Sequence, residues 1–196
     1  MTIELFIEQL LNGLQFGFML FLMSAGLTLI FGVMGLINLA HGSFYMIGAF
    51  SAAAIAAAFG SFWFSLLASL IVAAVAGVIV EILVIRRLYG RDHLDQVLAT
   101  FALILLFTES VRWIFGAYPL YLDVPDVLSG SVQIIGGIYY SKYRLFIILV
   151  GLLLAVLLFL IIGKTNFGAQ IRAGQHDREM ISALGVDISR LYTFLF

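Results

Sequence analysis

Long uncharged and apolar stretches dominate the pattern of this chain. No Lys, Arg, Asp or Glu occurs between Glu8 and Glu81, over positions 9 to 80. A helix needs about 20 residues to cross a bilayer, so this stretch has the length of about three crossings. Two further apolar runs follow it. The pattern predicts five membrane-spanning helices, over residues 10–33, 44–59, 62–85, about 97–115 and 145–163.

The two ends of the chain need separate treatment. No Lys or Arg precedes the first apolar run, and that run exceeds the roughly 7–15 residues of a signal peptide, so we expect a retained helix. The chain stops at Leu191–Phe196, whose composition suits the first turns of a sixth helix. Because a helix of that length is too short to span, we expect the chain to be a piece of a longer protein.

Composition supports a membrane protein and excludes several other classes. Hydrophobic residues make up 63% of the chain and charged residues 11%, with a mean hydropathy of +1.15. A soluble domain is about half apolar and about one-quarter charged. The formal net charge of −1 gives no basic field, which argues against a nucleic-acid partner. Without cysteine there are no disulfides, no thiolate metal site and no iron–sulfur cluster.

Positive charges predict the orientation of the chain. Seven of the ten Lys and Arg residues fall in two segments, after the third and the fifth predicted spans. Two crossings separate these segments, so both lie on one side, which the positive-inside rule makes cytoplasmic. They are Arg86, Arg87 and Arg91, then Lys164, Arg172, Arg178 and Arg190. We expect a multi-pass protein of the plasma membrane (the bacterial inner membrane) with its N-terminus outside.

Residues 116–144, between the fourth and fifth spans, are predicted to form an external loop. This segment holds both prolines and five of the eight tyrosines of the chain, and amphipathic rings favour the headgroup level. Alternating apolar positions flank a Gly-Gly pair that suits a two-residue hairpin turn. These positions are Val132, Ile134, Ile138 and Tyr140, around Gly136-Gly137.

The predicted fold class is an all-α membrane protein. It is a polytopic transmembrane helix bundle with about five complete spans, the start of a sixth and a small external hairpin. We expect residues 1–196 to form a single, partial transmembrane domain.

The polar stretch from Gly35 to Ser43 is the most informative part of the first half. Asn38 and His41 lie near the middle of the uncharged run, where an unsatisfied polar group costs several kcal/mol. We expect them to meet water, protein or substrate, at a helix break that opens backbone groups to a cavity. The alternative is a short connecting turn at the cytoplasmic surface with a solvated His41. A catalytic role for His41 with Ser43 has no partner acid, so we reject it.

Charged residues inside the spans have simple explanations. Glu109 and Arg112 are three residues apart near the outer end of the fourth span, which predicts a structural ion pair at headgroup depth. The alternative is a contact point for a molecule that arrives from outside. Glu81, near the inner end of the third span, is expected to pair with Arg86 or Arg87 or to extend toward the interface.

Residues 164–190 form the second informative segment, a cytoplasmic loop. Gly163-Lys164-Thr165 is similar to the end of a P-loop, but Leu158 stands where that pattern needs glycine. No nucleotide site is therefore expected, and any ATP dependence must come from another chain.

A short helix is predicted inside this loop. Asp177 suits its N-cap, and Gly185 suits a left-handed C-terminal end. Met180, Ile181 and Leu184 give the helix a small apolar stripe. Because two turns of helix do not persist alone in water, we expect support from the bundle or from a partner's groove. An ordinary cytoplasmic connector is the alternative.

Several short motifs tie the two informative segments to one family. They are Gly26–Gly35, Asn38-Leu39-Ala40-His41-Gly42, Phe44–Ala49, Phe167-Gly168, Ile171-Arg172-Ala173 and Ala183–Asp187. Together they resemble the permease subunits of ATP-driven importers for branched-chain amino acids, and more closely the shorter of the two permease types. The resemblance covers most of the chain, and its Asn-x-Ala-His-Gly core is specific.

The resemblance implies a division of labour among subunits. A second permease subunit completes the pathway, two cytoplasmic ATP-binding subunits power it, and a periplasmic amino-acid-binding protein delivers the substrate. ATP is then bound by the partners, so this chain is expected to have no cofactor and no catalytic site of its own.

The resemblance also implies roles for particular residues. Asn38, His41 and Gly42 would lie near the substrate pathway or its cytoplasmic side, and the hairpin would face the binding protein. The loop from Gly168 to Asp187 would be the coupling helix that docks into the ATPase. Its expected coupling residues are Gly168, Arg172, Ala173, Asp177, Leu184 and Gly185.

The expected activity is import of branched-chain amino acids, or of related small amides such as urea, by alternating access. The alternative is an ion-coupled secondary transporter or a channel. Buried acidic residues along the pathway would favour that alternative, and only Glu81 and Glu109 are candidates. A membrane-embedded enzyme would need an assembled catalytic set, which the sequence does not offer.

Overall fold

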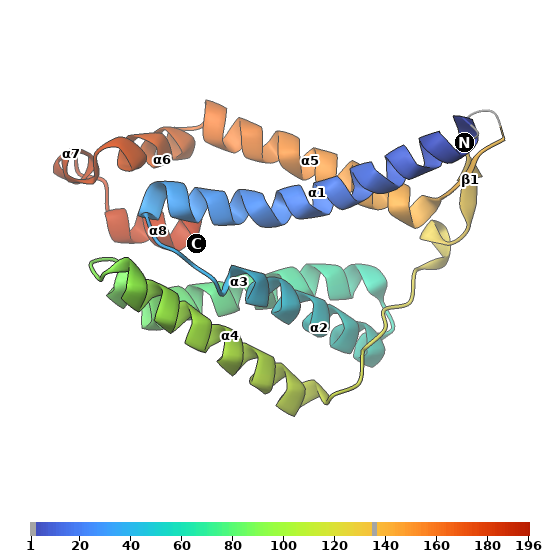
Figure 1. Cartoon of the computed structure of the whole chain (residues 1–196), viewed down its shortest axis with the longest axis horizontal. Coiled ribbons are helices and arrows are strands. Elements are labelled where there is room, and N and C mark those ends of the chain that lie inside the picture. Colours follow the sequence, from blue (N-terminus) through green and yellow to red (C-terminus); the bar gives the residue numbers. More distant parts are fainter. Residues whose placement is uncertain (1–2, 135–136) are drawn as a thin grey trace. The chain divides into compact units, whose positions relative to one another are not determined.

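The computed structural model describes residues 3–134 and 137–196. Within this part of the chain, five helices are long and apolar enough to cross a membrane (Figure 1). They are α1 (Ile3–Met34), α2 (His41–Phe59), α3 (Phe62–Leu83), α4 (His93–Phe115) and α5 (Lys142–Lys164). The five predicted spans are therefore confirmed. The helices extend past several apolar runs because polar residues at the ends of a span still continue the backbone hydrogen-bond pattern.

Short elements connect and follow the long helices. The short helices η1 (Ile85–Leu88) and η2 (Asp126–Leu128) have 3₁₀ geometry. Three more helices follow α5: α6 (Asn166–His176), α7 (Arg178–Ala183) and α8 (Ile188–Leu195). Helix α8 corresponds to the apolar segment that predicts the start of a sixth span.

The chain divides into two compact units, and α1 and α6 each contribute to both. The first unit contains the chain up to Ala25 together with Val124–Ala169. The second unit contains Gly26–Asp123 and Gln170–Phe196.

The first unit pairs the N-terminal part of α1 with α5 and carries the hairpin. The two helices approach closely at Gly151, where a Cβ atom would lie 2.7 Å from Cβ of Phe18. Strands β1 (Ser131–Gln133), labelled in Figure 1, and β2 (Tyr139–Ser141) are antiparallel. Val132 lies opposite Tyr140. The predicted hairpin is thus confirmed. Of its predicted turn, Gly136 lies outside the described residues, and Gly137 has a positive φ of 92°.

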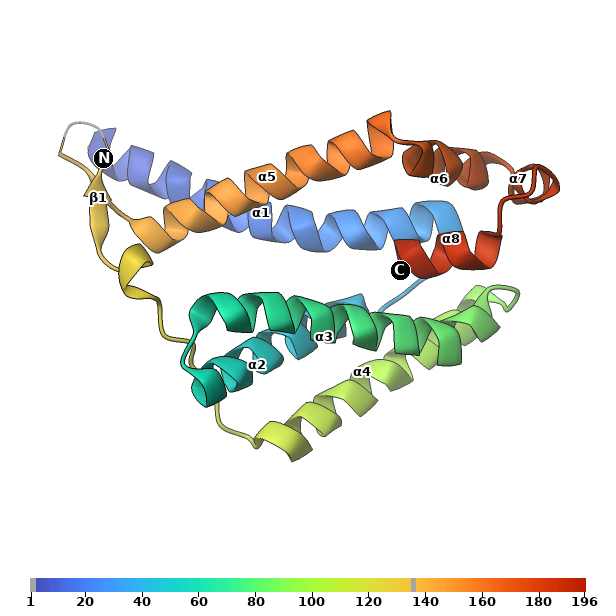
Figure 2. The same cartoon turned by 180° about the vertical axis from the view of Figure 1, so that it is seen from behind.

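In the second unit, α2 packs against both α3 and α4, the three helices that Figure 2 shows from behind. Its buried side chains include Ile30, Leu36 and Ile85, and large apolar side chains such as Leu70 are exposed, as expected for a surface that faces lipid. The buried hydroxyls of Ser51, Ser65 and Ser69 are satisfied inside their own helices. Ser65 donates to the carbonyl of Phe62 at 2.8 Å, a bond that needs no partner across the bundle.

Candidate functional site

The connection between α1 and α2 is a non-helical segment that is buried along one side. Helix α1 ends where Gly35 adopts a positive φ of 62° while its N–H donates to the Phe31 carbonyl at 2.9 Å. Leu36, Asn38 and Ala40 then alternate into the interior, each no more than 1% exposed. Leu39, by contrast, is 46% exposed, so the connection is buried along one side only.

Two polar side chains of α4 hold this connection. The Ile37 N–H donates to Oε1 of Gln96 at 3.3 Å, and Thr100 Oγ1 lies 3.5 Å from the Ile37 carbonyl oxygen. Gln96 in turn donates from Nε2 to the carbonyls of Leu88 and Arg91 at 3.3 and 3.2 Å. The non-helical backbone groups are therefore satisfied by protein side chains, which permits an irregular segment inside an apolar bundle.

Asn38 has only half of its amide group satisfied. Its Oδ1 accepts from the N–H of Ala40 at 3.0 Å, which closes a local turn and fixes which way the amide faces. Its Nδ2 is buried and has no hydrogen-bond partner among the described residues. An unsatisfied buried donor costs about 1–3 kcal/mol, so this nitrogen is a group that gains from meeting water or a ligand.

His41 and Gly42 begin α2 rather than sitting in the connection before it. The His41 imidazole is half-buried against α1, where a Cβ on Gly26 would lie 2.7 Å from Nε2. Glycine at position 26 therefore makes room for the ring. Gly42 is exposed, and a side chain there would meet open space. Asn38 and His41 are thus neighbours in the second unit, the His41 N–H donating to the Asn38 carbonyl at 3.4 Å, but only the Asn38 side chain is fully buried.

A sharp turn between α5 and α6 starts the predicted coupling segment. A Cβ atom on Gly168 would collide with the carbonyl oxygens of Ile161 and Ile162, so only glycine fits. Thr165 stabilises the turn, because its Oγ1 donates to the Ile161 carbonyl at 2.5 Å and accepts from the Gly168 N–H at 3.1 Å. Glycine at position 168 is therefore required by the backbone geometry of this turn.

The remainder of α6 is anchored on one face. Ile171 is buried, and a Cβ on Gly174 would lie 3.6 Å from Cδ2 of Leu191 in α8. Between these two positions, Arg172 and Ala173 are exposed. Of the three predicted coupling residues on α6, Arg172 and Ala173 therefore lie on its exposed surface, whereas Gly168 is buried.

Helix α7 has the predicted ends and a divided apolar stripe. The Asp177 carboxylate accepts from the Met180 N–H at 2.9 Å, and Gly185 has a positive φ of 88°, as predicted. Ile181 is only 5% exposed, whereas Leu184 is 78% exposed. Ile181 therefore anchors the helix, and Leu184, with Met180, presents apolar surface outward.

Glu81 forms a polar cluster that the sequence pattern indicated only in part. Its side chain is fully buried and pairs with Arg86, the Oε2–Nη2 distance being 3.0 Å, which confirms the predicted ion pair. Tyr89 donates from its hydroxyl to Oε1 at 2.6 Å, and Thr193 Oγ1 lies 3.0 Å from Oε2. We call Glu81, Arg86, Tyr89 and Thr193 the Glu81 cluster. An acidic residue ending an uncharged span was the available signal, but it does not reveal a partner 112 positions later.

Electrostatics within the cluster favours a neutral phenol beside a charged pair. Burial raises the pKa of Tyr89 far above its usual value, and the hydrogen bond to Glu81 raises it further. The hydrogen bond to Glu81 raises the pKa of the Arg86 guanidinium, which is exposed. The phenol therefore remains a hydrogen-bond donor to the carboxylate throughout the physiological pH range.

A shallow apolar pocket lies at the other end of α4. It has a volume of about 270 Å³, and its lining includes Met46, Phe50, Val111 and Arg112. Arg112 Nη1 is 3.1 Å from Oε1 of Glu109, which confirms the predicted ion pair. Both charged side chains are more than 60% exposed, so the pair contributes little to stability.

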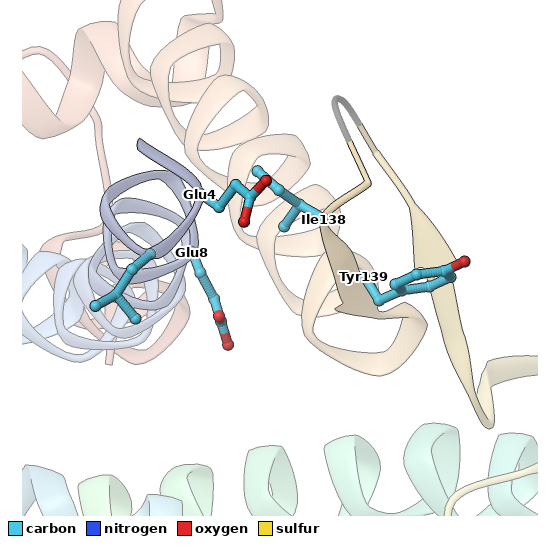
Figure 3. Close-up of a pocket in the computed structure, with 5 residues that line it drawn as sticks. Glu4, Glu8, Ile138 and Tyr139 are labelled. Carbon is cyan, nitrogen blue, oxygen red and sulfur yellow. The ribbon is translucent and has the colours of Figure 1, made fainter. Parts of the chain in front are cut away.

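A second pocket lies beside the hairpin in the first unit. Figure 3 shows Glu4 directed toward Ile138, and Glu8, Leu5 and Tyr139 complete the lining. The hairpin is tied to α1 through Asn12, whose Oδ1 accepts from the hydroxyl of Tyr140 at 3.1 Å. Across the described ranges, no group of three or more His, Asp or Glu side chains could hold a metal ion.

Comparison with known proteins identifies the family. Residues 9–196 match the family described as the branched-chain amino acid transport system permease component. The chain is 28% identical, over 97% of its length, to the high-affinity branched-chain amino acid transport system permease protein BraD of Pseudomonas aeruginosa. It is 25% identical over the same share to the corresponding protein LivH of Escherichia coli K12. A probable branched-chain amino acid transport permease protein LivH of Methanocaldococcus jannaschii is 27% identical over 90% of the chain.

The matches cover nearly all of this chain but only part of the length of its relatives. The chain spans 66% of the length of the first two relatives and 57% of the third. No solved structure matches it. Since the family match nevertheless runs through nearly the whole chain, and five of its helices are long and apolar enough to cross a membrane, this multi-pass membrane protein belongs to the family of branched-chain amino acid transport permease components.

Proposed function

We propose that the chain is the transmembrane permease subunit of an ATP-driven importer that moves branched-chain amino acids, or related small amides, into the cytoplasm. The observation that carries this proposal is the family match over residues 9–196. The long apolar helices and the partly buried, non-helical connection between α1 and α2 are consistent with it.

In the lipid bilayer, the proposed complex combines this chain with three other kinds of subunit. A second permease subunit completes the pathway, two cytoplasmic ATP-binding subunits supply energy, and a periplasmic amino-acid-binding protein delivers substrate. The names of the relatives support transport of branched-chain amino acids by such a system. In this arrangement, ATP is bound by the partners and this chain provides part of the pathway.

The proposed pathway runs past the connection between α1 and α2. The unpartnered Nδ2 of Asn38 is the buried donor best suited to a carboxylate or carbonyl oxygen of a passing substrate, or to a water that accompanies it. His41 and Gly42 follow this position, in the first turn of α2. These three residues are the proposed pathway residues of the chain.

The proposed coupling segment is the loop from Gly168 to Asp187. Its exposed Leu184 and Met180 offer apolar contacts to the ATP-binding subunit, while Ile181 holds α7 against its own bundle. ATP closing the two ATP-binding subunits would shift this segment and move the bundle between outward-open and inward-open states. Such a shift requires that ATP binding favours one state over the other.

Uptake by the reconstituted complex tests the proposal. The permease is co-expressed with the products of its neighbouring genes, placed in proteoliposomes with ATP inside, and supplied outside with the binding protein and labelled leucine. Accumulation of leucine that requires ATP, and that excess isoleucine or valine suppresses, is the expected result.

Two other outcomes would redirect the proposal. Suppression by urea or acetamide but not by isoleucine or valine would assign the small-amide substrate class. Uptake that continues without ATP, and that an ionophore abolishes, would overturn the importer in favour of an ion-coupled secondary transporter.

A further inference from the structure

The Glu81 cluster joins three segments that are distant in the sequence. Glu81 comes from the end of α3, Arg86 and Tyr89 from η1 and the residue after it, and Thr193 from α8. Arg86 Nη2 bridges the two ends, because it donates to Oε2 of Glu81 at 3.0 Å and to Oγ1 of Thr193 at 2.9 Å. The cluster therefore ties α8 to the end of the third membrane helix.

The burial of Glu81 makes this connection specific. A carboxylate with no exposed surface is costly unless it is paired and hydrogen-bonded. Here both oxygens are used: Oε1 accepts from Arg86 Nε and Tyr89, and Oε2 accepts from Arg86 Nη2 and lies beside Thr193. Arg86, Tyr89 and Thr193 all hydrogen-bond to the same carboxylate. Displacement of α8 would therefore leave Glu81 with fewer hydrogen-bond partners.

Helix α8 is also attached at its other faces. The ring of Tyr192 packs edge-on against Tyr89, with centroids 5.1 Å apart, and its hydroxyl donates to the Val33 carbonyl at 3.5 Å. Leu191 is buried against Gly174 of α6. The Asp187 carboxylate caps the helix by accepting from the Arg190 N–H at 3.1 Å.

These contacts give α8 a position between the coupling segment and the bundle. The proposed coupling segment ends at Asp187, and α8 begins at the next residue. The same helix touches α6 through Leu191 and the end of α3 through Thr193. A displacement of α7 that moves α8 would therefore act directly on the Glu81 cluster.

We propose that the Glu81 cluster is the element that transmits movement of the coupling segment to the third membrane helix, with Thr193 and Glu81 as its positioning residues. This inference rests on the proposed function as an ATP-driven importer. The cluster does not touch substrate or ATP. It keeps α8 and α3 moving together, so that ATP hydrolysis by the partner subunits is converted into opening of the pathway.

The test is the amount of leucine transported per ATP hydrolysed by the assembled complex in proteoliposomes. The Thr193→Val variant removes the hydroxyl with little change in shape, and Thr193→Ser, the matched control, keeps it. We expect Thr193→Val to hydrolyse ATP at least as fast as the wild type, while leucine transported per ATP falls by about fivefold or more. Thr193→Ser is expected to stay near the wild-type ratio.

A double substitution separates this role from a general effect on folding. If Glu81 and Thr193 act as one unit, Glu81→Gln combined with Thr193→Val lowers the ratio no further than the stronger single variant. Should Thr193→Val fail to assemble, Tyr89→Phe, which removes a different hydrogen bond to the same carboxylate, takes its place with the same expectation.

The outcomes distinguish the inference from the function on which it rests. A wild-type complex that couples ATP to uptake, beside variants with an unchanged ratio, would overturn the inference alone. Equal losses of uptake and ATP hydrolysis in an assembled variant would also overturn it, because they indicate a structural role. A wild-type complex without ATP-driven uptake would overturn the proposed function and this inference with it.

Discussion

At the scale of single residues, Asn38 contrasts with buried serines of the second unit. The hydroxyls of Ser65 and Ser69 donate to carbonyls of their own helices, at 2.8 and 2.9 Å. These bonds satisfy the hydroxyl wherever the helix moves. Asn38 differs, because its Oδ1 is committed to a local turn while its Nδ2 is left without a partner among the residues described. A residue that serves only structure would have little reason to keep such a donor.

Replacement of Asn38 by Ser is expected to reduce uptake while leaving the fold intact. A serine hydroxyl can still accept from the Ala40 N–H, but the substitution removes the Nδ2 donor of the amide. Loss of one hydrogen bond of about 1.4 kcal/mol corresponds to about tenfold slower uptake of labelled leucine at low concentration. The control is Ser51→Ala, which removes a buried hydroxyl bonded to the carbonyl of Gly48. Wild-type uptake by Asn38→Ser would remove Asn38 from the proposed pathway.

Replacement of Gly168 by Ala is expected to destabilise the protein, because the added methyl collides with backbone carbonyls that cannot move aside independently. The turn between α5 and α6 must open, at a cost of about 1–3 kcal/mol. Gly163→Ala is the matched control, since a Cβ there meets nothing within 4 Å. Thermal unfolding in detergent should show a lower midpoint for Gly168→Ala only. Equal midpoints for the two variants would contradict the tight turn.

At the scale of elements, apolar length predicts the spans but does not predict their partners. A run of about 20 apolar residues has one favourable environment, so all five long helices followed from the sequence. The caps of α7 were also predictable, because Asp177 and Gly185 act within a few residues of themselves. By contrast, Gln96 supports Ile37 from 59 positions away, and Thr193 reaches Glu81 from 112. Such contacts depend on helix packing, which the pattern of one chain does not specify.

The exposed part of α7 carries a prediction at this scale. In the Leu184→Asp variant, a carboxylate replaces an apolar side chain that is 78% exposed and anchored by the neighbouring Ile181. The bundle should remain folded, whereas docking should weaken by about 2 kcal/mol or more, or at least about thirtyfold, if Leu184 is central to the interface. Co-purification with the ATP-binding subunits measures this. Ser182→Asp adds the same charge on the same helix as a control, and normal co-purification of Leu184→Asp would exclude Leu184 from the interface.

At the scale of the whole molecule, charge distribution and the contacts of α8 support the same topology. The segments that hold Arg86 and Arg190 meet within the second unit, because Thr193 bonds both Glu81 and Arg86. Two basic segments at one end of the unit are what the positive-inside rule requires if both are cytoplasmic. With three crossings before Arg86, we expect the N-terminus and the hairpin segment to be external.

Single cysteines test this topology directly, because the chain contains none of its own. In intact cells, a membrane-impermeant maleimide should label the Val127→Cys variant, whose site in η2 is 73% exposed. The Ser182→Cys variant, in α7, should react only after the membrane is permeabilised. Glu4→Cys, near the N-terminus, should behave like Val127→Cys because an odd number of crossings separates it from Arg86.

If Glu4→Cys is protected while Val127→Cys is labelled, the chain crosses an even number of times before Arg86. The connection between α1 and α2 would then have to return within the membrane, and the proposed pathway position of Asn38 would need to be redrawn.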